Sequence, residues 1–148
     1  MDWFNYYGLG IVVLLLVPNI IYAVSQKPMN ETCPHKTLYF LEQIGRYGSI
    51  AFMIVNAPYT YFGFFFDGAL WVYLIVNGIL VASYVFFWVL LWKKNGLWKG
   101  ISLSTIPTLI FFFSAVLLRS IPLLTASILF GIGHITVSIN NALNERKE

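Results

Sequence analysis

Uncharged apolar segments alternate with short polar segments along this chain. The segment from Ala69 to Trp92 has 24 residues and no formal charge. As an α-helix it would rise about 36 Å, enough to cross a hydrocarbon core of about 30 Å with some tilt. Its Leu, Val, Ile and Phe residues outweigh the insertion cost of its one amide side chain, Asn77. The segment therefore predicts a transmembrane helix.

A second long apolar region runs from Ile101 to Asn141 and contains one charged residue, Arg119, in 41 positions. A continuous helix of this length would be about twice as long as a bilayer requires. Arg resists burial in lipid and Pro suits the start of a helix, so the segment Arg119 to Pro122 predicts a turn between two spans.

Two further spans are predicted before residue 69. The first has Pro18 and Asn19 in its later half, where a kink is expected because Pro removes a backbone donor. The second contains Asn56 and follows a lead-in in which Glu42 and Arg46 are spaced to pair on one helix face. The complete prediction is an all-α integral membrane protein, a compact bundle of five transmembrane helices at about residues 4–24, 45–64, 69–92, 101–118 and 123–142.

The distribution of basic residues predicts the orientation of this bundle. With the N-terminus outside and the C-terminus in the cytoplasm, the cytoplasmic segments carry eight Lys or Arg residues and the outer segments carry only Arg119. Basic residues are retained preferentially in the cytoplasm, so this arrangement is strongly favoured. A four-span alternative would bury Arg119 and place the basic C-terminal tail outside, and it is rejected for that reason.

Composition supports a membrane location and limits the range of functions. The chain is 59% hydrophobic and 10% charged, with a mean hydropathy of +0.76, whereas soluble proteins average about 25% charged residues. We expect one domain, residues 1–148, in a plasma membrane of the bacterial type. The first apolar segment lacks preceding basic residues and is expected to be a retained span rather than a signal peptide. Nucleic acid is not an expected partner, because the basic residues form no patch.

Polar residues deep in predicted spans are the candidate functional residues, because they require partners or a wet cavity. Asn56, Asn77 and His134 are predicted within about one helical turn of the midplane, and Asn19 lies nearer the cytoplasm. They are expected to form one cluster that either binds a ligand or only holds helices together. No Asp or Glu is predicted at the depth of His134, which argues against a carboxylate proton relay.

Small residues four positions apart predict close helix contacts, because they let helix backbones approach each other. Three such pairs lie in the predicted spans: Gly45 with Ser49, Gly78 with Ala82, and Ser127 with Gly131.

No catalytic, metal-binding or cofactor-binding residues are predicted. The chain contains one cysteine, Cys33, and two histidines, whereas a closed zinc site requires four ligands. The nucleophile elbow of serine hydrolases is absent, and so are glycine patterns that bind phosphates or dinucleotides. An intramembrane enzyme is therefore the least favoured hypothesis.

The favoured hypothesis is a small multi-pass membrane protein that binds or transports a small apolar or amphipathic molecule in an aromatic-lined cavity. Asn19, Asn56, Asn77 and His134 would orient this ligand, since pockets combine apolar walls with few polar groups. The alternative is a non-catalytic accessory or scaffold protein in which the buried Asn and His residues only pack helices. The expected partners are the lipid bilayer, the small ligand, and a second copy or a larger membrane protein.

Overall fold

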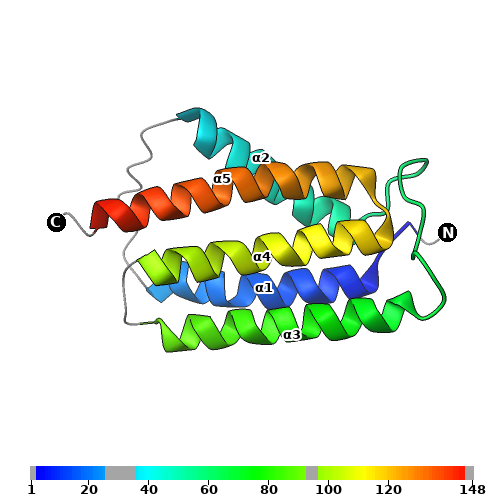
Figure 1. Cartoon of the computed structure of the whole chain (residues 1–148), viewed down its shortest axis with the longest axis horizontal. Helices are drawn as coiled ribbons and strands as arrows, with labels where there is room; N and C mark the ends of the chain where they lie inside the picture. The colour runs from blue at the N-terminus through cyan, green and yellow to red at the C-terminus, as the bar shows by residue number, and fades with distance from the viewer. Residues whose placement is uncertain (1–2, 26–35, 93–96, 146–148) are drawn as a thin grey trace.

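The computed structural model describes residues 3–25, 36–92 and 97–145, and within these ranges the regular structure is helical. Five helices alternate in direction along one long axis, so that the chain's two ends lie at opposite ends of the bundle (Figure 1). Their bounds are α1 Tyr6–Ser25, α2 Lys36–Ile54, α3 Ala69–Leu90, α4 Leu97–Leu118 and α5 Ile121–Glu145. The prediction of an all-helical chain is confirmed for these residues.

Three of the five helices are long and apolar enough to cross a membrane. They are α3 over its whole length, α4 from Trp98 to Leu118 and α5 from Ile121 to Leu143. Among the described residues, α1 contributes a shorter apolar segment, Tyr6–Ile21. The charged residues of α2, among them Glu42, lower its hydropathy. Length and composition therefore support membrane crossing for α3, α4 and α5.

The predicted turn between the last two spans is confirmed. Helix α4 ends at Leu118, and α5 begins at Ile121 with Pro122 in its first turn. Arg119 lies between the helices with a left-handed φ of 51°. This backbone conformation reverses the chain within two residues, because it cannot continue a right-handed helix.

The second predicted span, residues 45–64, is wrong in its position. Helix α2 begins nine residues earlier and ends at Ile54, and residues 55–68 form a loop. The cause is Pro58, because a proline disfavours the helical conformation of the residue before it and cannot donate a helix hydrogen bond. The aromatic residues that follow Pro58 are uncharged, as expected in a transmembrane span, but they lie in this loop.

The loop 55–68 closes one end of the bundle through backbone hydrogen bonds to two other segments. Asn56 N donates to Trp3 O at 2.9 Å, and Ile121 N donates to Thr60 O at 3.1 Å. The Arg119 guanidinium lies over the ring of Phe62, 5.4 Å from its centroid. The loop is therefore connected to both the N-terminal segment and the turn between α4 and α5.

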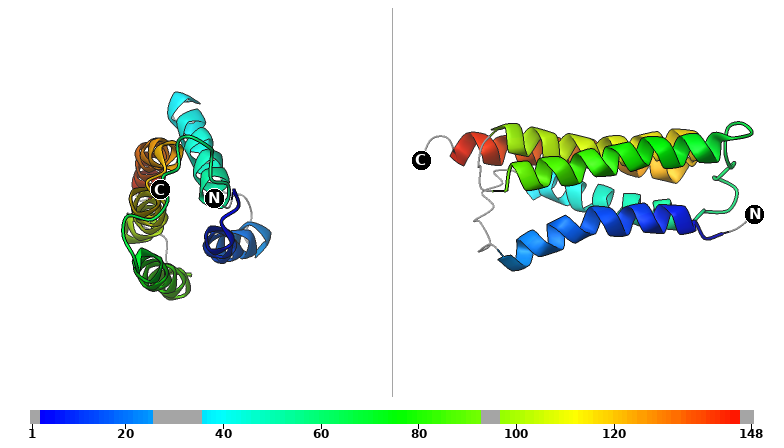
Figure 2. Two further views of the ribbon diagram at one scale, coloured as in Figure 1. Left: turned by 90° about the vertical axis from the view of Figure 1, so that its right-hand side faces the viewer. Right: turned by 90° about the horizontal axis from the view of Figure 1, so that it is seen from below.

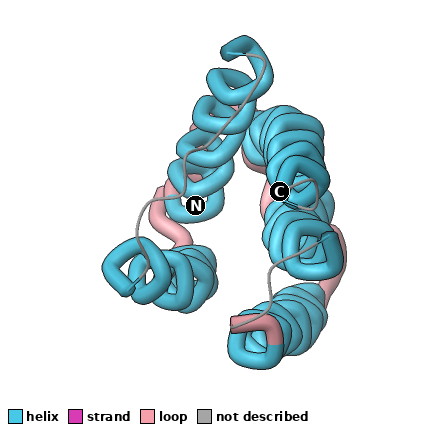
Figure 3. Tube along the Cα trace, turned by 90° about the vertical axis from the view of Figure 1, so that its left-hand side faces the viewer, coloured by secondary structure: helices cyan, strands magenta, loops and turns pink. Residues whose placement is uncertain are grey.

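The helices form two layers, with α1 and α2 facing a layer of α3, α4 and α5 (Figures 2 and 3). Helix α5 packs extensively against both α2 and α4. Helices α2 and α5 approach closely at Gly45, where an added Cβ would lie 2.2 Å from Phe130 N, and at Gly133, where it would lie 2.7 Å from Glu42 Cα. Gly131 packs in the same way against the side chain of Thr108 on α4.

Two of the three predicted small-residue pairs thus lie at helix contacts, whereas the third does not. A Cβ added at Gly78 would meet no atom within 4 Å. The largest fully buried side chains lie mostly toward the end closed by the loop: Met53, Tyr73, Ile110, Leu118 and Leu123. Tyr84, which is also fully buried, lies on α3 toward the other end, so the core continues into that half of the bundle.

Candidate functional site

A cavity of about 500 Å³ lies between the two helix layers and has wall residues from all five helices. It extends from the middle of the bundle toward the end at which α1, α3 and α5 end and α2 and α4 begin. Figure 2 shows α1 inclining away from the three-helix layer toward this end. This inclination separates the two helix layers at this end of the bundle.

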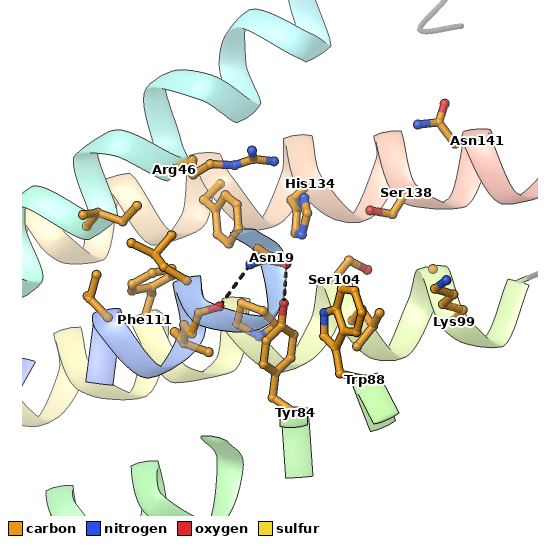
Figure 4. Close-up of a pocket in the computed structure, with 18 of the residues that line it drawn as sticks. Asn19, Arg46, Tyr84, Trp88, Lys99, Ser104, Phe111, His134, Ser138 and Asn141 are labelled. Atoms are coloured by element: carbon orange, nitrogen blue, oxygen red, sulfur yellow. Dashed lines mark hydrogen bonds between the residues drawn. The ribbon is translucent and has the colours of Figure 1, made fainter. Parts of the chain in front are cut away.

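The chemical character of the cavity wall changes along the helix axis. One end, here called the apolar end, is lined by Val12, Leu15, Ile50 and Phe111. The other, here called the polar end, is lined by Lys99, Ser138 and Asn141. Figure 4 shows Phe111 on one side of the cavity and Lys99 and Asn141 on the other.

A band of polar residues lies between these two ends and contains Asn19, Arg46 and His134 (Figure 4). Asn19 Oδ1 accepts a hydrogen bond from the Tyr84 hydroxyl at 2.9 Å, and its Nδ2 donates to Leu15 O at 3.1 Å. Asn19 therefore links α1 to α3, as expected for an amide deep in a helical bundle.

His134 is oriented by a buried carboxylate on α2. Its Nδ1 lies 2.8 Å from Glu42 Oε1, and the Glu42 side chain is only 4% exposed. An ionised carboxylate only accepts, so the imidazole donates from Nδ1. Arg46 Nη2 donates to the same carboxylate oxygen. The Glu42 carboxylate thus has two partners, Arg46 on its own helix and His134 on α5.

The remaining nitrogen of His134 is available to the cavity. Phe130 stacks on the imidazole, with ring centroids 4.6 Å apart and planes 16° apart. In the part of the chain that the structure describes, Nε2 has no hydrogen-bond partner. Figure 4 shows the ring projecting toward Asn19. Glu42 and Phe130 therefore fix the direction in which Nε2 points.

The prediction that no acidic residue lies at the depth of His134 is wrong. Glu42 contacts it directly, because α2 begins at Lys36 and runs antiparallel to α5. The sequence signal for this site was the spacing of Glu42 and Arg46, which predicts their ion pair, and that pair is confirmed. The spacing could not reveal that the pair faces α5.

Asn77 does not line the cavity. It is fully buried, with Nδ2 3.2 Å from Ser114 Oγ, and so it connects α3 to α4. Asn56 is also outside the cavity, in the loop at the closed end. Its prediction as a midplane residue fails because α2 ends two residues before it. Of the four predicted site residues, the cavity brings together Asn19 and His134.

The described residues lining the cavity include further polar groups that the sequence did not single out, namely Tyr84, Lys99 and Asn141. Lys99 Nζ lies 6.0 Å from the centroid of the Trp88 ring. The Asn141 side-chain oxygen is buried and accepts no hydrogen bond from the described residues. An unpaired buried amide is costly, so this oxygen is a candidate contact for a ligand.

Within the described ranges, no group of three His, Cys, Asp or Glu residues could hold a metal ion. Cys33 and His35 lie outside these ranges. No described hydroxyl or thiol is hydrogen-bonded to His134. The arrangement can bind and orient a molecule through His134, Asn19 and the polar end, and it can enclose an apolar group at the other end.

Comparisons of the chain with models of protein families, with curated proteins and with solved structures give no match, so the case for function depends on this geometry.

Proposed function

We propose that this protein is a multi-pass membrane protein that binds a small amphipathic molecule in the cavity between its helix layers. The observation that carries the proposal is the cavity itself, with about 500 Å³ of space and a wall that is apolar at one end and polar at the other. Sites for small molecules typically have volumes of about 300 to 1,000 Å³, apolar walls and a few placed polar groups.

We further propose that all five helices cross the bilayer, including the shorter α1 and the more polar α2. Large apolar side chains are exposed on both, for example Leu14 and Ile20 on α1 and Phe40 and Ile44 on α2. Exposed apolar side chains of this size suit lipid rather than water. The strict alternation of helix direction supports crossing by each helix (Figure 1).

The two ends of the bundle support an orientation with the N-terminus outside. The closed end exposes several aromatic side chains, including Tyr59, Phe65, Phe66 and Trp71. Aromatic residues of this kind are enriched at the membrane interface. The opposite end has the described lysines, Lys36 and Lys99, and basic residues favour the cytoplasmic side. In this arrangement the polar end of the cavity faces the cytoplasm.

The proposal can be tested by filling the cavity. Leu16 lines it, whereas Leu14, two residues earlier, is 54% exposed on the outer surface of α1. We expect Leu16→Trp to displace a co-purifying small molecule, as detected by native mass spectrometry and by lipid extraction of the purified protein. Leu14→Trp adds the same side chain outside the cavity and should leave occupancy unchanged.

The alternative, an accessory protein whose polar residues only pack helices, is favoured by one contact, the buried pair of Asn77 and Ser114. It leads to the opposite result in the same experiment. No small molecule would recur between preparations, and Leu16→Trp would raise or lower the melting temperature without changing any bound mass. That outcome would overturn the binding proposal.

A further inference from the structure

We infer that the molecule bound in this cavity is an anionic amphiphile, with a single acidic headgroup at the polar end beside Lys99 and an apolar chain toward Phe111. This inference rests on the proposed binding function and adds the chemical class of the ligand. The headgroup chemistry is a carboxylate or a phosphate monoester, as in a fatty acid or a lysophosphatidic acid.

The charged residues on the cavity wall favour an anionic ligand. The described lining residues include two cations, Arg46 and Lys99, and the titratable His134, but no Asp or Glu. The nearby carboxylate of Glu42 is 4% exposed and already accepts from both Arg46 and His134. Because Glu42 already balances Arg46, Lys99 supplies the charge that the wall presents at the polar end, and an anionic group is favoured there over a cationic one.

The position of the headgroup follows from Lys99 and Asn141. The Lys99 ammonium lies over the Trp88 ring, which holds it at the cavity wall. Asn141 contributes a buried amide whose oxygen has no partner among the described residues. A side-chain amide presents either an acceptor or two donors, depending on its rotation. An acidic headgroup with a neighbouring hydroxyl or ester would find a cation and an amide together at this end.

The length of the cavity wall supports an extended chain. Lys99 and Phe111 are both on α4 and line opposite ends of the cavity. Their separation by twelve residues corresponds to about 18 Å along a helix. A volume of about 500 Å³ distributed over this length makes the cavity elongated. Apolar side chains at the far end would shield a hydrocarbon chain from water.

The test compares ligands that share one chain and differ in charge. Delipidated protein in phosphatidylcholine nanodiscs is titrated calorimetrically with dodecanoic acid, dodecyl phosphate, dodecanol and dodecylamine, with empty nanodiscs as the blank. Charge-assisted hydrogen bonds are about twice as strong as neutral ones, so we expect both anions to bind at least about tenfold more tightly than dodecanol. Dodecylamine should bind most weakly.

Variants at Lys99 test the position of the headgroup. Lys99→Gln should reduce the preference for the anions over dodecanol to below about threefold, whereas Lys99→Arg should retain it. Lys36→Gln is the matched control, because Lys36 is exposed at the same end of the bundle and does not line the cavity. It should retain the full preference. The mass of any endogenous ligand in native spectra then distinguishes a fatty acid from a lysophosphatidic acid.

The outcomes separate this inference from the proposed function. Equal binding of dodecanol and the anions to the wild-type protein would overturn the inference and leave the binding function intact. A preference that survives in Lys99→Gln would overturn the assigned headgroup position. Failure of all four compounds to bind, with no endogenous ligand found, would overturn the binding function itself.

Discussion

At the scale of single residues, the buried carboxylate of Glu42 is the feature that most constrains the site. A carboxylate that is removed from water requires compensation, because its desolvation costs several kcal/mol. Here the compensation comes from Arg46, one turn along the same helix, and from His134 on α5. Glu42 therefore has two roles, since it joins two helices and also determines which nitrogen of His134 faces the cavity.

The coupling between Glu42 and His134 can be measured by a double-mutant cycle with Glu42→Gln and His134→Gln. We expect each single change to lower the free energy of unfolding by about 1 to 3 kcal/mol, because it leaves a buried polar group poorly paired. The double variant should lose less than the sum, with a coupling of about 0.5 to 3 kcal/mol. Denaturant titration of the detergent-solubilised protein provides these free energies.

A second cycle with Lys36→Gln and His134→Gln is the control and should show additive effects, since the exposed Lys36 is not bonded to His134. Additive effects in the Glu42 cycle as well would mean that the 2.8 Å contact contributes no stability.

At the scale of helices, the sequence locates boundaries where a charge or a turn residue marks them. The predicted spans at 69–92, 101–118 and 123–142 correspond to α3, α4 and α5, because Gly68, the Lys93–Lys94 pair and Arg119 separate them in the sequence. Helix α4 starts at Leu97, four residues before the predicted span. The second span fails because residues 59–66 are uncharged and six of the eight are aromatic. Hydropathy alone cannot distinguish such an aromatic loop from a transmembrane helix. Pro58 is the residue in the sequence that indicates that the helix ends before this segment.

Glycine contacts provide a prediction at this scale. A Cβ at Gly45 would lie 2.2 Å from the backbone nitrogen of Phe130, an atom that cannot move aside without shifting α5. We expect Gly45→Ala to lower the free energy of unfolding by about 1 to 3 kcal/mol, as overpacked sites do. Because α2 and α5 carry the Glu42 to His134 contact, ligand occupancy should fall as well.

Gly78→Ala is the matched control for this substitution. Gly78 is also inside a helix, but an added Cβ would meet no atom within 4 Å. The change should be neutral or should stabilise the protein by up to about 1 kcal/mol, because alanine has the higher helix propensity. Equal losses for the two variants would show that helix packing at Gly45 is looser than the structure indicates.

At the scale of the whole molecule, the cavity is the feature that the sequence could not predict. It lies between the helix layers, where α1 inclines away from the opposite layer (Figure 2). This depends on how five helices pack against one another, which no segment encodes alone. The sequence could identify Asn19 and His134 as polar residues at depth, but not that Asn77 would be closed off by Ser114.

The proposed five crossings lead to a test directed at α2, the most polar helix of the bundle. Cys33, the single cysteine, precedes α2 in the sequence, and Tyr59, which is 96% exposed, follows it. If α2 crosses the membrane, these two positions are on opposite sides. We therefore expect an impermeant maleimide to label Tyr59→Cys in a Cys33→Ser background in intact cells and to leave the native Cys33 unlabelled. Permeabilised cells should show labelling of both, which confirms that each thiol can react.

The other labelling patterns have distinct meanings for the architecture. Labelling of both positions, or of neither, in intact cells would show that α2 does not cross, and the bundle would then contain fewer spans than proposed. Labelling of Cys33 alone would invert the orientation and place the polar end of the cavity outside. Because Lys99 lines that end, an inverted protein would admit an anionic amphiphile from the outer side of the membrane rather than from the cytoplasm.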